Sequence, residues 1–181
     1  MRTCRWILPT LALAGALAAG CMLLSGQFLV SFDLPSPLSV TPEAVMCAGV
    51  DLHAVAAYRE HVDDLKDVTD IAVLGEFTNT GAAAVDVDVW MTPGLTAYTD
   101  AASVVLDDTA VKVWGPLRVA PGATRKIGWD ESAALFAGGR AALLREVLGD
   151  GVFTLYALGG TSSYSFRLEH GCLVAVVAAG K

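Results

Sequence analysis

Ile71-Ala-Val-Leu-Gly-Glu-Phe-Thr-Asn79 and Val85-Asp-Val-Asp-Val-Trp-Met91 are the two stretches of sequence that decide the fold of this chain. In the second stretch apolar and polar residues alternate, which is the two-residue period of a strand with one buried face. The first stretch shows the same period less strictly. The connection Asn79-Thr-Gly-Ala-Ala83 contains residues that accept the positive φ angles of tight turns, so it predicts a hairpin loop between the two strands.

Further segments along the chain resemble strands, and turn signals such as Pro93-Gly94 separate them. Helical spacing occurs twice. Asp51 is placed to cap a helix over residues 52–66. A second helical region covers residues 131–148, with a break at Gly138-Gly139. The remaining expected strands are residues 28–34, 110–114, 124–129, 152–158, 164–168 and 172–178.

These elements predict a mainly β fold, an antiparallel immunoglobulin-like β-sandwich with two helical insertions, because many short strands with frequent turns suit two packed sheets. The likeness to immunoglobulin domains is meant in the broad sense, since the Cys and Trp spacing of true immunoglobulin domains is absent. The alternative is an α+β fold with a single sheet covered by the helices.

The start of the chain has the order of an export signal. Arg2 and Arg5 carry positive charge, residues 6–19 are an apolar stretch, and small residues lead to Cys21. These features indicate a secreted protein.

Small residues before a cysteine resemble the lipobox of bacterial lipoproteins, although Leu17 lies one place further from the cysteine than is usual in that family. The resemblance implies that residues 1–20 are a cleaved signal peptide and that Cys21 carries the lipid. Residues 21–27 are then a lipidated tether, and residues 28–181 form a single β-sandwich domain. The whole chain is similar to lipoproteins of this architecture that have no assigned activity.

Two alternatives to the lipid anchor stay open. No charge occurs between Arg5 and Asp33, and a run of that length can span a bilayer of about 30 Å and stay as a membrane anchor. Cleavage elsewhere gives a secreted protein with Cys21 as a free thiol. If the resemblance holds, the protein belongs to the bacterial cell envelope, and Met22 after the cysteine favours the outer membrane, facing the periplasm, over the inner membrane.

The chain is acidic, with 12 Lys and Arg against 19 Asp and Glu and a net charge of −7. Phosphate binding needs clustered basic residues, and the sequence has no such cluster, so a nucleic acid is not an expected partner. We expect no cofactor.

Cys47 and Cys172 are the two cysteines that lie after the lipid site. In an oxidising compartment such a pair favours a disulfide, which would close a loop of more than about 100 residues. The alternative is two buried thiols, because Cys172 opens an apolar run. The pair lacks the Cys and His spacing of a metal site.

None of the three histidines has partners that indicate catalysis. His53 and His61 lie two turns apart on the predicted helix, too far apart to share a metal. His170 falls in a Glu-His-Gly sequence typical of a tight turn between strands, and no serine-nucleophile motif accompanies it. A hydrolase that uses His170 is therefore only an alternative.

Four aspartates near the end of the first predicted helix are the weak candidates for a metal site. They supply the hard oxygen ligands that calcium prefers, but their spacing does not match an EF-hand loop. A solvated acidic turn explains them equally well. The four are Asp63, Asp64, Asp67 and Asp70.

Trp90 and Trp114 are the candidate binding residues, because each shares a strand face with charged residues and exposed tryptophans give a large contact area at low entropic cost. They could instead fill space beneath the helices, and Trp129 is expected in the core. We therefore expect a lipid-anchored, non-catalytic interaction or structural module that binds an envelope protein or a glycan. The alternative is a calcium-dependent binder or hydrolase that uses the aspartates or His170.

Overall fold

The computed structural model describes residues 25–45, 47–136, 138–160 and 163–180. The expected signal peptide and Cys21 lie outside the described residues, as do residues 22–24 of the expected tether. Within the described part of the chain, no helix is long and apolar enough to cross a membrane.

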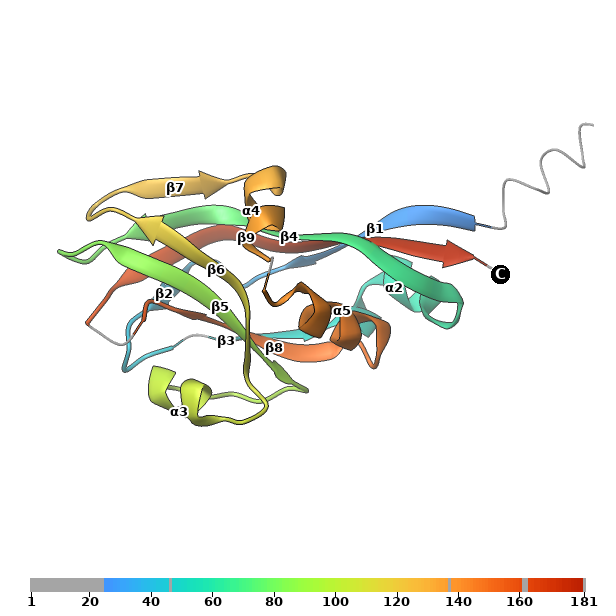
Figure 1. Ribbon diagram of the computed structural model, residues 1–181, viewed down its shortest axis with the longest axis horizontal. Helices are drawn as coiled ribbons and strands as arrows, with labels where there is room; N and C mark the ends of the chain where they lie inside the picture. Colours follow the sequence, from blue (N-terminus) through green and yellow to red (C-terminus); the bar gives the residue numbers. More distant parts are fainter. Residues whose placement is uncertain (1–24, 46, 137, 161–162, 181) are drawn as a thin grey trace, which may run out of the picture.

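The described residues form two antiparallel sheets that pack face to face (Figure 1). The first sheet has the order β1 (Ser25–Asp33), β9 (Phe166–Gly180), β4 (Leu65–Asn79) and β7 (Thr124–Ile127), and the short β2 (Leu38–Val40) also pairs with β9. The second sheet has the order β3 (Cys47–Asp51), β8 (Val152–Leu158), β5 (Val85–Pro93) and β6 (Val111–Val119). The predicted mainly β, antiparallel sandwich is confirmed.

The strand pairs are nested along the sequence. β5 pairs with β6, β4 with β7, β3 with β8 and β1 with β9. Apart from the steps from β1 to β2 and from β5 to β6, each successive strand lies in the other sheet. The chain is thus one long hairpin rolled into two sheets, which is the connectivity of a jelly roll.

The prediction of a hairpin between residues 71–79 and residues 85–91 is wrong, because β4 and β5 lie in different sheets. The loop between them carries the chain from one sheet to the other. Asn79 supports this crossing, since its side-chain amide donates hydrogen bonds to the carbonyl oxygens of Ala83 at 2.8 Å and Val119 at 2.9 Å. The turn residues do form a loop, but this loop connects the two sheets instead of two neighbouring strands of one sheet.

The core lies between the two sheets and holds the residues that the two-residue period places on one face. Both sheets contribute large side chains that are almost fully buried. Among them are Ile71, Phe77, Val87, Met91, Phe153, Phe166 and Val177.

The first predicted helix is much shorter than expected. Residues 52–66 hold a 3-10 turn η1 (Leu52–Ala54), the six-residue helix α2 (Ala56–His61) and a second 3-10 turn η2 (Val62–Asp64), and β4 begins at Leu65. The cap is as predicted, because the Asp51 carboxylate accepts the His53 backbone N–H at 2.9 Å. The first residues of β4 pair with the end of β9, and this sheet pairing overrides the helical spacing.

The second predicted helical region is confirmed, with its break at the two glycines. It consists of α4 (Trp129–Leu135) and α5 (Arg140–Leu148). Both helices contact β4 and β6, so they close one side of the sandwich (Figure 1). A further helix, α3 (Ala101–Leu106), was not predicted; it belongs to the connection from β5 to β6 and packs over the outer face of the second sheet.

The last two predicted strands are one continuous strand, β9. The predicted turn at His170 is instead a β-bulge, in which His170 and Gly171 oppose the single residue Gly75 of β4. His170 has a φ of 54° there. β2 and β3 were also missed, because both strands are short and β2 lies between Pro37 and Pro42.

Candidate functional site

A cleft of about 420 Å³ on the outer face of the first sheet is the best candidate site. It crosses three neighbouring strands, β7, β4 and the bulge of β9, and the first residue of α4 also lines it. Its lining combines apolar strand residues with charged and aromatic groups. The lining residues are Leu74, Gly75, Glu76, Lys126, Ile127, Gly128, Trp129 and His170.

Trp129 is half-buried and is held by its indole N–H. Nε1 donates a hydrogen bond to Oδ2 of Asp70 at 2.9 Å. The other carboxylate oxygen of Asp70 accepts the Ile71 backbone N–H at 2.9 Å and pairs with the Arg140 guanidinium at 3.3 Å. The acceptor is therefore fixed from both the strand and α5, and it orients the tryptophan beside the cleft.

The bulge in β9 places His170 at the cleft. Its backbone N–H donates a hydrogen bond to Oγ of Ser36 at 3.2 Å, and its side chain is exposed. The facing residue of β4 has to be glycine, because Gly75 has a φ of 155° and a Cβ there would lie 2.6 Å from Cδ1 of Leu168. The backbone conformation of β4 and β9 thus fixes the position of the His170 imidazole on the sheet.

Glu76 and Lys126 form an ion pair across β4 and β7, with 3.3 Å between Oε1 and Nζ. The two residues are opposite each other in the strand register. The side chain of Glu76 is 35% exposed and that of Lys126 is 81% exposed. Because the charges cancel, the pair gives the cleft hydrogen-bonding groups of both kinds without a net charge.

The groups at the cleft suit non-covalent binding better than nucleophilic catalysis. Cys172 also lies on the outer face of the first sheet, but burial first, and then the negative charge of Asp33, raise the pKa of its thiol. A nucleophilic cysteine needs the opposite shift, toward the thiolate. Ser36 contacts the backbone N–H of His170, but among the described residues that line the cleft there is no serine or threonine.

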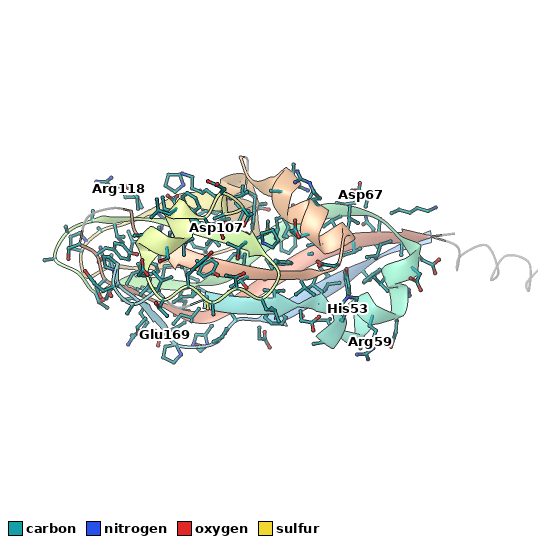
Figure 2. The ribbon with its side chains drawn as sticks, turned by 90° about the horizontal axis from the view of Figure 1, so that it is seen from below. His53, Arg59, Asp67, Asp107, Arg118 and Glu169 are labelled. Carbon is teal, nitrogen blue, oxygen red and sulfur yellow. The ribbon has the colours of Figure 1, made fainter. Side chains whose placement is uncertain are left out.

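The four aspartates proposed as metal ligands do not converge. Asp63 and Asp64 belong to η2, whereas Asp67 and Asp70 belong to β4, and Asp70 is engaged by Trp129 and Arg140. Figure 2 shows Asp67 near the end of the molecule where β1 begins. Across the residues that the structure describes, no group of three His, Cys, Asp or Glu side chains is arranged to hold a metal.

The expectation that Trp114 is a surface binding residue is wrong, because its side chain is only 1% exposed. A register shift between β5 and β6 breaks the two-residue period here and turns Trp114 inward. Trp90 does lie on the outer face of the second sheet, but the segment that carries α3 partly covers it. The two tryptophans therefore do not share a surface.

The predicted disulfide between Cys47 and Cys172 is not formed, and both cysteines are free thiols. Their neighbours Ala48 and Leu173 point into the core, so both cysteines point outward from different sheets. Packed sheets lie about 10 Å apart, and a disulfide needs Cα atoms within about 7 Å. The sandwich itself keeps the two thiols apart.

A second depression, of about 680 Å³, lies beside α3. Its wall carries Val105 and Leu106, which are 50% and 80% exposed, and its rim carries Glu43 and Asp100. Asp100 is already used as the cap of α3, where its carboxylate accepts the Ser103 backbone N–H at 2.9 Å. Among the described residues, none that lines this depression is aromatic.

Sequence reasoning found His170 and Asp70 but gave them other roles, and it placed Trp129 in the core. The available signal was the Gly128-Trp129 pair directly after the short strand β7, since a glycine beside a tryptophan at a strand end leaves room for a cleft. A Cβ at Gly128 would meet nothing within 4 Å. That signal does not say which side of the sheet the indole takes.

No family model matches the chain, and no match was found among curated proteins. Solved structures with a partial likeness include mud crab tombus-like virus, with 9% identity over 87% of this chain and 81% of that chain and a TM-score of 0.37. Two structures of Tobacco streak virus coat protein have 14% identity and a TM-score of 0.27. One match covers 83% of this chain and 85% of that chain, and the other 86% and 87%. Scores this low establish no shared fold.

Proposed function

We propose that this protein is a lipid-anchored, non-catalytic binding module of the bacterial cell envelope, tethered through Cys21, that recognises an envelope protein or glycan. The observation that carries the binding role is the cleft beside Trp129, whose indole Asp70 holds in place, and the described residues that line this cleft include no serine, threonine or cysteine. An aromatic residue fixed before binding lowers the entropic cost of association. The anchor rests on the leader and the cysteine that ends it.

The ends of the sandwich fit a short tether. Ser25 at the start of β1 pairs with Gly180 at the end of β9, so both ends of the described chain lie at one end of the molecule (Figure 1). Cys21 precedes Ser25 by four residues, which reach at most about 14 Å when extended. A lipid on Cys21 would therefore hold this end of the sandwich close to the membrane.

Fractionation of the cell envelope tests the anchor. The full chain is expected in the membrane fraction, with an intact mass that includes acyl chains and lacks residues 1–20. The Cys21→Ser variant is expected to leave the membrane fraction and to lack the acyl mass. Cys4→Ser, within the expected signal peptide, is the matched control and should behave as the wild type does. Membrane association of both variants without acyl mass would reject the lipid anchor.

Capture of bound components from detergent-solubilised envelope tests the binding role. The wild type is expected to retain a protein or glycan that Trp129→Ala loses, because the substitution removes the aromatic wall of the cleft. Trp90→Phe, outside the cleft, is expected to retain it. Loss with Trp90→Phe but not with Trp129→Ala would move the binding surface to the second sheet.

A further inference from the structure

The composition of the cleft points to a class of ligand. Resting on the binding function proposed above, we propose that the cleft binds a neutral saccharide, with one sugar ring lying against the indole of Trp129 and its hydroxyl groups contacting Glu76, Lys126 and His170.

Trp129 supplies an apolar surface of the right kind. One edge of the indole is tied to Asp70 at 2.9 Å, so the ring cannot turn away when the cleft is empty. A fixed aromatic ring loses little entropy on binding and offers a flat apolar surface. The apolar C–H face of a pyranose ring is a suitable partner for that surface.

The cleft carries no excess charge, although the protein as a whole has a net charge of −7. Its one anion, Glu76, is paired with its one cation, Lys126, at 3.3 Å. A phosphorylated or strongly anionic ligand would need unpaired basic groups, and a cation would need unpaired acids. The balance favours a neutral ligand.

The cleft is a broad surface depression, which fits a polar ligand. Its volume of about 420 Å³ lies within the range of about 300 to 1,000 Å³ of small-molecule sites. The cavity in the core between the sheets, by contrast, is only about 20 Å³ and has an almost wholly apolar lining that includes Phe77 and Leu168. A volume of about 20 Å³ holds about one water molecule, so the core cavity is too small for a small-molecule ligand.

The polar groups on the rim both donate and accept hydrogen bonds. The Glu76 carboxylate accepts, the Lys126 ammonium donates, and the His170 imidazole can do either. Sugar hydroxyl groups also donate and accept, so each rim group can be satisfied by the same kind of ligand atom. Two strands and a bulge position the three side chains on one face of the sheet.

The test measures binding of chitotetraose, cellotetraose and maltotetraose to the full chain in detergent, by calorimetry and by tryptophan fluorescence. The wild type is expected to bind at least one of the three. Trp129→Ala should weaken that binding at least tenfold. Trp129→Phe should weaken it less, because a ring remains. Glu76→Gln should weaken it a few-fold.

Glu131→Gln is the matched control for Glu76→Gln, since Glu131 also pairs with a cation, Arg125, but lies outside the cleft. It should bind as the wild type does. Thermal unfolding of every variant separates lost binding from lost folding, and Trp129→Phe and Glu76→Gln keep the test valid if Trp129→Ala does not fold.

The inference is overturned if the wild type binds none of the three saccharides, or if Trp129→Phe, Glu76→Gln and a folded Trp129→Ala all bind as the wild type does. A wild type that captures an envelope protein through Trp129 but binds no saccharide would leave the proposed binding function standing and reject the saccharide. Failure of capture and of saccharide binding together would reject both.

Discussion

The indole of Trp114 on β6 donates a hydrogen bond from Nε1 to Oγ of Ser132 on α4 at 3.0 Å. The same hydroxyl oxygen accepts the backbone N–H of Val73 on β4 at 2.8 Å. Ser132 is fully buried, so one side chain joins the two sheets through the helix that lies between their edges. The Ser132 hydroxyl also gives the Val73 N–H an acceptor at a position of β4 that is no longer paired with β7.

Ser132→Ala is expected to lower the free energy of unfolding by about 1 to 3 kcal/mol, because it leaves the Val73 N–H buried without an acceptor. Trp114 keeps a second acceptor, the Ser132 carbonyl oxygen at 3.1 Å, so the loss comes mainly from β4. Chemical denaturation measures it. Ser31→Ala, at an exposed position on β1, is the control and should change stability by no more than about 0.5 kcal/mol. Equal effects at the two serines would contradict this role.

The sequence patterns predicted the strands well where one face is buried and the other is exposed. β5 and β8 have nearly the predicted bounds, because each alternates or stays apolar between clear turns. Where the period is broken by a bulge, as at Trp114 and His170, prediction failed, since a bulge shifts every later side chain to the other face.

Pairing between distant strands is the other part that the sequence does not show. The first residues of β4 resemble a helix locally and become a strand only because β9 is available as a partner. The cleft also depends on contacts between segments that are distant in the sequence. Trp129 and Asp70 form their hydrogen bond because β7 and α4 pack along the edge of β4. No local sequence pattern predicts that contact.

Asp88 is expected to make stability depend on pH. Burial raises the pKa of its carboxyl above the ordinary 3.8, and the nearby charge of Asp86 adds to this, while Lys112 opposes it. One carboxylate oxygen pairs with Lys112 at 3.5 Å, and the other is buried without a hydrogen bond among the described residues.

Because the folded pKa is raised, the folded state favours the protonated acid, and stability is lost as the pH rises from the unfolded pKa through the folded pKa. Replacement by the neutral Asn removes this cost. The unfolding free energy of Asp88→Asn minus that of the wild type should therefore increase as the pH rises from about 4 to 7. Denaturant titrations across this range measure the difference, with the exposed Asp86→Asn as the control for removing a charge from β5. A difference that falls as the pH rises would contradict the assignment.

Both Cys47 and Cys172 are expected to react as thiols in the purified protein. Alkylation in denaturant without reductant, followed by peptide mapping, should label both residues. In the folded protein Cys172 should react more slowly than after unfolding, because its raised pKa leaves less thiolate. Recovery of a peptide pair linked through Cys47 and Cys172 would show that the sandwich can rearrange to join its two outer faces.

Gly139 and Gly138 form the break before α5, but only one of them is closely packed. A Cβ at Gly139 would lie 2.5 Å from the Lys112 carbonyl oxygen and 2.6 Å from that of Val113, both on β6, whereas a Cβ at Gly138 would meet nothing within 4 Å. The φ of Gly139 is −114°, so alanine is acceptable to the backbone and only the contact with β6 forbids it.

Gly139→Ala is therefore expected to lower the free energy of unfolding by about 1 to 3 kcal/mol or more, because the strand backbone has to move away from α5. Gly138→Ala should stay within about 0.5 kcal/mol of the wild type. Denaturant unfolding of the two variants measures the contrast. Equal losses would mean that the conformation of the break requires glycine, whereas a loss at Gly139 alone means that α5 closes the sandwich by direct contact with the backbone of β6.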